Sequence, residues 1–333
     1  MAAAQSGRAG QSPKLAQVPG NLTPFSGERA YEHVKKLVGF GPRPAGSKAL
    51  ERARRYIIEQ LPGTDPRVRL PYGRDGVSDL ARRELTERED TWVADTPAGK
   101  VRMTNIVFEL PGETEDIIII AGHYDTKHFK EFPFVGANDG GSSAAVLVEL
   151  ARVLANSKRP RRLGYRFVFF DGEEAVCREW DECGKPGAPD NTYGSRHYLA
   201  RLRVRGQLKH VRALILLDMV GYERLELGRD TMSTPWLVDL IWKTARGMGY
   251  GRQFVERAEG VGGDDHEPFL RAGVPAADII QLNSYPHWHT PADTLDKISP
   301  SSLKAVGDVV VASLPAIEER VSGVGSQVPG KIR

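Results

Sequence analysis

Four short apolar runs in this chain are each followed closely by a carboxylate or an imidazole. The runs span residues 116–122, 164–170, 212–217 and 275–282. Apolar runs of this length without alternation are typical of strands buried on both faces, as in a mostly parallel sheet covered by helices. The pattern therefore predicts an α/β fold with chemically active side chains at the strand ends.

Segments with helical spacing alternate with the apolar runs. Helices are expected at 26–40, 47–61, 142–155, 194–203, 235–247, 266–272 and 300–319, and alternating strands at 91–95 and 101–109. Ser47 is expected to cap the second helix, because its hydroxyl can accept from a free backbone N–H. Alternation of strands and helices predicts the doubly wound α/β class: one domain, with a mostly parallel twisted central sheet and helices on both faces.

The two ends of the chain and one internal stretch differ in composition from the rest. Residues 1–22 and 322–333 are rich in Gly, Ser, Pro and Gln, and flexible tails are expected there. Residues 62–88 are charged and interrupted by Gly and Pro, so we expect a surface excursion. The catalytic domain is therefore expected to span residues 23–321.

The groups that follow the apolar runs are of the kinds that bind metals. They are His123 with Asp125, Glu173 with Glu174, Asp218 and His289, together with Asp139 in a Gly-flanked turn before a helix. In parallel sheets, ligands bind outside the carboxyl ends of the strands. Imidazoles and carboxylates gathered at that edge predict a metal site, and zinc is the first candidate.

The first strand end offers a ligand and its support. Residues two apart in extended chain point the same way, so Asp125 can accept the spare imidazole proton of His123 and orient the ring. The alternative is a strand-end histidine that is merely satisfied by its neighbour. Asp139 has two interpretations as well, a metal ligand or the N-cap of the following helix.

Glu173 and Glu174 form the sharpest local signal. Two adjacent acids after a buried strand repel each other unless a cation or a shared proton relieves them. With a metal present, one can ligate while the other serves as general acid and base; the alternative is a solvated loop pair. Asp218 ends another apolar strand, where a carboxylate is seldom buried without a partner.

The later loops contribute further candidates. His289 would complete the ligand set, with His287 as the competing choice. Asp264, with Asp265 next to it, precedes an expected helix and is either a site residue or a helix cap. Trp180, Tyr285 and Trp288 are aromatic residues near the site segments, and they either form a substrate pocket or contribute packing alone.

Composition excludes some classes of function. A formal net charge of +3 in 333 residues, with no basic stripe, argues against nucleic acid as a partner. No apolar stretch approaches the roughly 20 residues of a spanning helix. Cys177 and Cys183 are either two thiols or a local loop staple. The compartment stays open between a secreted or periplasmic mature form and a cytoplasmic protein.

These motifs resemble the zinc exopeptidase family that contains single-domain bacterial aminopeptidases and glutaminyl-peptide cyclotransferases. The resemblance covers about residues 28–320, with five motifs in the expected order. They are Gly122-His-Tyr-Asp, Gly136-Ala-Asn-Asp, Phe170-Asp-Gly-Glu-Glu, Leu217-Asp and His289-Thr. The resemblance implies the phosphorylase/hydrolase-like fold of that family and peptide or protein N-termini as substrates.

Some stretches look like the cyclotransferase branch and others like the aminopeptidases. Residues 123–127, 134–139, 193–197, 264–275 and 288–290 are cyclase-like, whereas 140–145 and 290–298 are aminopeptidase-like. In the cyclase branch, the resemblance implies a single zinc on Asp139, Glu174 and His289. In the aminopeptidase branch, His123 and Asp218 would hold a second zinc.

The cyclase branch implies a role for each remaining residue. Glu173 would move the proton, Asp218 and Asp264 would complete its hydrogen-bond network, and Trp288 would line the substrate pocket. Trp180 resembles another pocket tryptophan at a slightly different spacing. We favour the cyclotransferase, which converts N-terminal Gln to pyroglutamate with release of ammonia, over the aminopeptidase. An inactive binding protein is a third hypothesis, which the complete ligand set disfavours. A monomer is expected.

Overall fold

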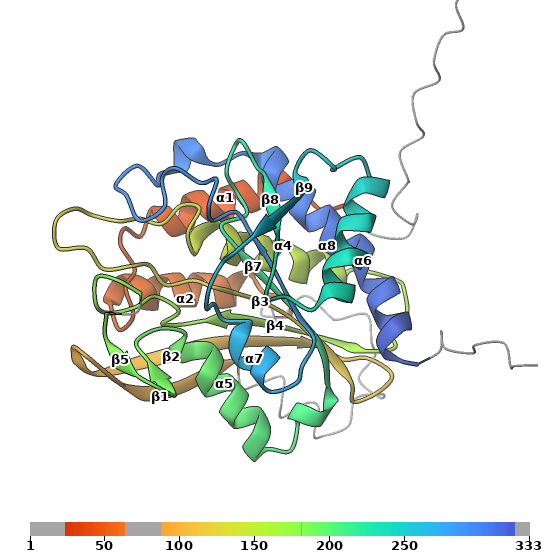
Figure 1. The fold of residues 1–333 in the computed structure, drawn as a ribbon, viewed down its shortest axis with the longest axis horizontal. Coiled ribbons are helices and arrows are strands. Elements are labelled where there is room, and N and C mark those ends of the chain that lie inside the picture. Colours follow the sequence, from red (N-terminus) through yellow and green to blue (C-terminus); the bar gives the residue numbers. More distant parts are fainter. Residues whose placement is uncertain (1–23, 64–87, 181, 324–333) are drawn as a thin grey trace, which may run out of the picture.

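One six-stranded sheet organises the computed structural model, which describes residues 24–63, 88–180 and 182–323 (Figure 1). Its strands are β1 (Glu89–Thr96), β2 (Gly99–Leu110), β3 (Ile117–His123), β4 (Gly164–Phe170), β7 (Val211–Asp218) and β10 (Ala276–Ile280), in the order β1-β2-β4-β3-β7-β10. The strands β4, β3, β7 and β10 are parallel, and β2 runs antiparallel to both of its neighbours. The mostly parallel sheet predicted from the apolar runs is confirmed.

Helices cover both faces of this sheet. They are α1 (Gly27–Val38), α2 (Lys48–Gln60), α4 (Gly141–Ala155), α5 (Tyr193–Val204), α6 (Pro235–Gly247), α7 (Glu267–Arg271) and α8 (Pro300–Val321). In the view of Figure 1, α5 and α7 lie below the sheet, and α1, α4, α6 and α8 lie above it. The predicted helix positions are confirmed, and Ser47 accepts from the Leu50 N–H as the expected cap of α2.

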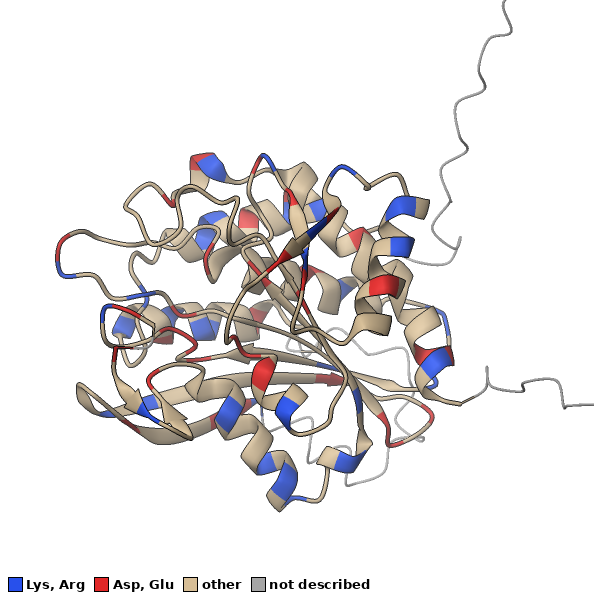
Figure 2. Ribbon diagram, in the orientation of Figure 1, with Lys and Arg blue, Asp and Glu red and all other residues tan. Residues whose placement is uncertain are grey.

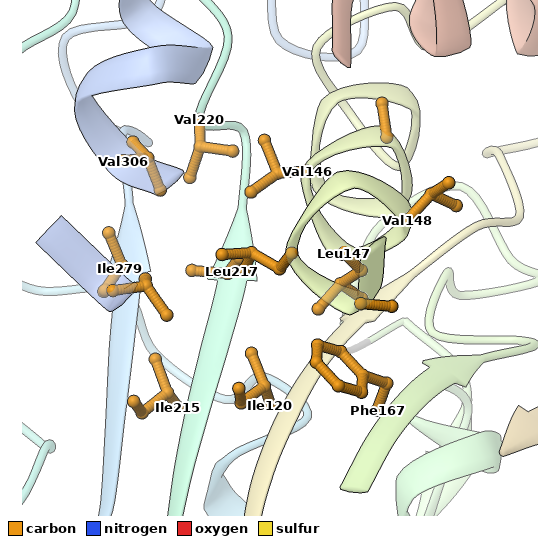
Figure 3. Close-up of a cluster of buried hydrophobic side chains, with 14 of the residues drawn as sticks. Ile120, Val146, Leu147, Val148, Phe167, Ile215, Leu217, Val220, Ile279 and Val306 are labelled. Atoms are coloured by element: carbon orange, nitrogen blue, oxygen red, sulfur yellow. The ribbon is translucent and has the colours of Figure 1, made fainter. Parts of the chain in front are cut away.

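The two faces of each central strand bury different apolar clusters. Ile118 and Ile120 of β3 belong to the larger cluster, which also contains residues of α4 and α8. Figure 3 shows Ile120 on the side of the sheet that α4 covers. The neighbouring residues Ile117 and Ile119 face the opposite side, where α5 and α7 pack. Alternation of side chains in a strand sends adjacent residues to opposite faces, so an unbroken apolar run is what a doubly covered strand requires.

Two small sheets were not expected from the sequence. The strands β8 (Leu227–Asp230) and β9 (Phe254–Glu259) pair in parallel, and β5 (Gly184–Lys185) and β6 (Ala188–Pro189) form a hairpin. These strands have two to six residues and no apolar run, so they carry no periodic signal. The expected tail 1–22, the 64–87 part of the expected excursion and residues 324–333 lie outside the described residues.

Charged side chains are interspersed over the surface. Lys and Arg, as well as Asp and Glu, occur on the visible helices and loops (Figure 2). No helix in the part of the chain that the structure describes is long and apolar enough to cross a membrane.

Candidate active site

The carboxyl ends of β3 and β7 bring the first group of ligand-type side chains together. His123 is the last residue of β3 and Asp218 the last of β7. The Nε2 atom of His123 lies 3.1 Å from Asp218 Oδ1 and 3.2 Å from Asp139 Oδ1. Since β3 and β7 are adjacent and parallel, their ends meet at one edge of the sheet, and the turn before α4 adds Asp139.

A second group shares Asp139 with the first. His289 Nε2 lies 3.5 Å from Asp139 Oδ2 and 3.3 Å from Glu174. One ligand atom from each of Asp139, Glu174 and His289 lies within 4.8 Å of the others, and the same holds for His123, Asp139 and Asp218. Asp139 therefore presents one carboxylate oxygen to each group.

This donor set fits a zinc ion. Asp139 Oδ2 and Glu174 Oε2 are buried and accept no hydrogen bond from the residues that the structure describes, although buried polar atoms are ordinarily satisfied. Two carboxylates and an imidazole are common zinc ligands, and a catalytic zinc has three protein ligands and an open position. Asp139 does not cap α4, because Gly140 is the N-cap residue and no side chain bonds there.

Asp125 supports both strand ends at once. Its carboxylate accepts the backbone N–H groups of Glu173 and Glu174, and Oδ1 lies 3.4 Å from His123 Nδ1. His123 is thus held from behind while its Nε2 faces the ligand groups. The fully buried Arg43 lies near this carboxylate. Its guanidinium donates to the carbonyls of Val135 and Gly136, and these hydrogen bonds hold the loop before Asp139.

The two adjacent glutamates have opposite electrostatic environments. Burial raises the pKa of the Glu173 carboxyl well above its ordinary value. The nearby His123 lowers this pKa, and the charges of Glu174 and Asp264 raise it further. Burial also acts on Glu174, but His289 and Lys127 outweigh it and lower the pKa of that carboxyl. Glu173 therefore binds a proton more tightly than Glu174 does.

Two residues at the site have backbone conformations that side chains disfavour. His289 has φ 53°, and Met219, directly after Asp218, has φ 45°. Such left-handed residues cost of order 1–3 kcal/mol each and cluster at functional sites. The Met219 N–H donates to Asp218 Oδ1, so the turn that carries this strain also orients the Asp218 carboxylate.

A cavity of about 530 Å³ opens over the ligand groups. Trp180 and Trp288 line it, together with Glu173 and Asp264. Trp288 is 43% exposed and stacks on the His289 ring with centroids 4.3 Å apart. A cavity of this size accommodates a drug-sized ligand, and its floor of carboxylates suits a cationic amino group.

Tyr285 does not line this cavity, which corrects the expectation from its place near the site. Its ring is buried against Tyr222, and its hydroxyl donates to Asp293 Oδ1 at 2.7 Å. His287, the competing ligand, contacts the same two tyrosine rings and is absent from both ligand groups. The direction in which a tyrosine or histidine side chain points from a loop depends on tertiary packing, and the residue type alone does not indicate it.

Asp264 lies at the cavity wall and does not cap the following helix. His266 is the N-cap residue of α7, and no side chain bonds to that end. Behind Asp264, the fully buried His266 lies between two carboxylates, with Nε2 3.3 Å from Asp230 Oδ2 and Nδ1 3.8 Å from Asp278 Oδ2. Burial, with Asp218 as a second cause, raises the pKa of Asp264 to about 6.

Two residues that hold the ligand segments in place were not predicted from the sequence. Asp293 accepts the backbone N–H groups of Asn138 and Asp139, which holds the ligand turn. The Lys127 N–H donates to Glu174 Oε1, and its buried ammonium donates to the carbonyls of Ala175 and Cys177. Both lie in motifs that pointed to the site, but a charged residue in a loop gives no signal of an inward direction.

The two cysteines form a disulfide, so the local staple is the correct alternative of the two. Cys177 and Cys183 are bonded, with their Cα atoms 6.0 Å apart. Trp180 lies between them in sequence and lines the cavity.

Comparison with known proteins assigns the class. Residues 105–314 match Peptidase family M28, so the chain belongs to this family and the predicted resemblance to zinc exopeptidases and cyclotransferases is confirmed. The glutaminyl-peptide cyclotransferase of Bos taurus is 30% identical over 67% of this chain and 69% of its own length. That of Drosophila melanogaster is 29% identical over 60% of this chain, and the match spans 61% of its length.

Solved structures have the same fold. A glutaminyl cyclase from an Acidobacteriales bacterium superposes with a TM-score of 0.76 at 33% identity, over 95% of this chain and 100% of that chain. A leucine aminopeptidase precursor from Bacteroides thetaiotaomicron superposes with a TM-score of 0.72 at 28% identity, over 88% and 98%. The chain is thus similar to proteins named for each of the two activities.

Proposed function

We propose that this protein is a zinc-dependent glutaminyl-peptide cyclotransferase, which converts the N-terminal Gln of a peptide to pyroglutamate and releases ammonia. One observation carries the proposal. Asp139, Glu174 and His289 converge at the floor of a cavity where Glu173, a buried carboxyl outside both ligand groups, lies beside them. Similarity to a glutaminyl cyclase at 33% identity supports the same conclusion.

The cavity provides each group that this reaction needs. A zinc ion held by Asp139, Glu174 and His289 would polarise the γ-amide carbonyl of the glutamine. The carboxylate of Glu173 takes a proton from the α-amine, whose nitrogen then bonds to the amide carbon. Glu173 passes the proton to the amide nitrogen as the carbon–nitrogen bond breaks, so ammonia leaves and the ring remains.

The aromatic side chains at the walls of the cavity would orient the substrate. Trp288 covers the His289 ring, and Trp180 lines the same space. Asp218 and Asp264 line the cavity next to Glu173, where they complete a network of carboxyl groups. Asp264 adds to the raised pKa of Glu173, which brings this carboxyl nearer to the proton affinity of an amine.

A di-zinc aminopeptidase is the second candidate, and the shared carboxylate of Asp139 favours it. The second group of His123 and Asp218 on the other oxygen of Asp139 has the arrangement of a bridged two-metal site. In such an enzyme, Glu173 would move the proton of the water that attacks the first peptide bond.

Two substrates and a metal analysis test the proposal. A cyclotransferase should release ammonia from a Gln-peptide without cleaving it and should leave leucine-p-nitroanilide intact. Release of free leucine, together with two tightly bound zinc ions per chain, would contradict the cyclotransferase. Retention of one zinc with ammonia release is the expected result.

A further inference from the structure

The loop that the Cys177–Cys183 disulfide closes, called the disulfide loop below, is attached to the site at its Cys177 end. The Cys177 N–H donates to Asp190 Oδ2 at 2.8 Å, and the Cys177 carbonyl accepts from the buried Lys127 ammonium at 2.9 Å. The same lysine donates its backbone N–H to Glu174, a ligand-group carboxylate. The position of Cys177 is therefore set by groups that also hold the candidate metal centre.

The other end of the loop continues into the exposed wall of the cavity. Cys183 directly precedes the hairpin of β5 and β6, whose residues 184–188 are exposed, and Lys185 and Pro186 of this hairpin line the cavity. The disulfide links this exposed segment covalently to the anchored Cys177.

Trp180 lies between the two cysteines in sequence, and its side chain lines the cavity. Its carbonyl accepts from Asn191 Nδ2 at 3.3 Å. Gly263 lines the same cavity, and a Cβ placed on it would lie 3.8 Å from Trp180 Nε1, so the indole packs against this glycine. The position of the indole relative to Gly263 therefore sets part of the shape of the cavity lining.

We propose that the Cys177–Cys183 disulfide is a positioning element of the substrate pocket. It holds Trp180 in its place before the peptide binds, and its loss weakens binding of the peptide amino terminus without slowing the chemical step. The inference rests on the proposed function for its kinetic readout. Ordering a loop and a large side chain on binding reduces affinity, and a covalent constraint removes that cost beforehand.

The kinetic test replaces both cysteines in the full chain. In C177S/C183S, KM for a Gln-peptide should rise about threefold to tenfold, as expected for one more side chain to order, while kcat changes less than about twofold. Zinc content should equal that of the wild type. An unchanged KM, or a fall in kcat with constant KM, would overturn the proposal.

A double-mutant cycle with Trp180 separates positioning from general stability. In a W180A background, loss of the disulfide should raise KM by less than about twofold, because the side chain that the disulfide positions is gone. An equal rise in both backgrounds would contradict the proposal. Reduction of the wild type with tris(2-carboxyethyl)phosphine should reproduce the KM rise, whereas C177S/C183S should not respond to the reductant.

Hydrogen exchange gives a readout that does not depend on turnover. The Glu182 N–H donates to the Glu179 carbonyl inside the loop, and its exchange should be at least about tenfold faster in C177S/C183S. Equal exchange would overturn the proposal even if the protein were inactive. A wild type that turns over neither Gln-peptide nor leucine-p-nitroanilide would instead contradict the proposed function, while the exchange result would still decide the role of the disulfide.

Discussion

Replacement of Glu173 by glutamine tests the assignment of the proton shuttle. The substitution keeps the shape of a side chain that is 7% exposed and replaces its carboxyl by an amide, which cannot act as a base. The backbone N–H of residue 173 still donates to Asp125, so the local fold should be kept. Because burial already raises the pKa of Glu173, a neutral amide should not lower stability.

The expected loss follows from the role of the group. General acid–base catalysis contributes about 10²–10⁴ in rate, so kcat should fall by that factor, equivalent to about 3–5 kcal/mol. Zinc content should not change, because Glu173 belongs to neither ligand group and its Oε2 lies 3.7 Å from His123 Nδ1. KM should change little, since a proton transfer is made only in the transition state.

The assay measures ammonia release from a Gln-peptide at saturating substrate, with zinc determined on the same sample. Glu113→Gln is the matched control, because Glu113 is exposed and lies at the other end of the sheet strands, and its activity should equal that of the wild type. If Glu173→Gln retained zinc and turned over within about tenfold of the wild-type rate, the assignment of Glu173 as the shuttle would be refuted.

Three further predictions follow from the site. His289→Ala should weaken zinc binding more than about 100-fold, beyond the effect of removing a residue that only supports a ligand, whereas His287→Ala should leave it unchanged; equal zinc loss in both would contradict the ligand choice. Tyr285→Phe should lower the unfolding free energy by about 1 kcal/mol, because the hydrogen bond to Asp293 is lost. KM should not change, and a raised KM would indicate that Tyr285 contacts the substrate. In metal-free protein, burial and Glu174 raise the pKa of Asp139 to about 7. The native state then keeps a proton that the unfolded chain has released, so the unfolding free energy should fall from about pH 4 to pH 7. Asp139→Asn should flatten this fall in thermal unfolding, and an unchanged slope would exclude Asp139 as its cause.

Apolar runs predicted the central strands because a strand that is buried on both faces needs an unbroken apolar sequence. Residues 164–170 were expected as a strand and form β4 over the same residues. The predicted helix at 235–247 coincides with α6. By contrast, the β8–β9 pair has no such sequence, because β9 exposes charged residues on a short strand. Its pairing depends on a partner distant in the chain.

The candidate ligands were visible for a related reason. Carboxyl ends of neighbouring parallel strands meet at one edge, so His123 and Asp218 were expected together before their distance was known. No comparable rule predicts where the side chain of a loop residue points. His289 and Trp288 line the cavity, whereas His287 and Tyr285 pack against Tyr222.

The amino-acid sequence by itself determined the fold class, the family and the set of side chains available for a metal site. These properties follow from periodicity and residue type, which act locally along the chain. Only the tertiary structure decided that Asp139 belongs to two ligand groups at once, that Glu173 belongs to neither, and that a disulfide closes the loop that carries the cavity-lining Trp180. Each of these depends on distances between elements far apart in sequence, and such distances are set by packing of the whole sheet and its helices.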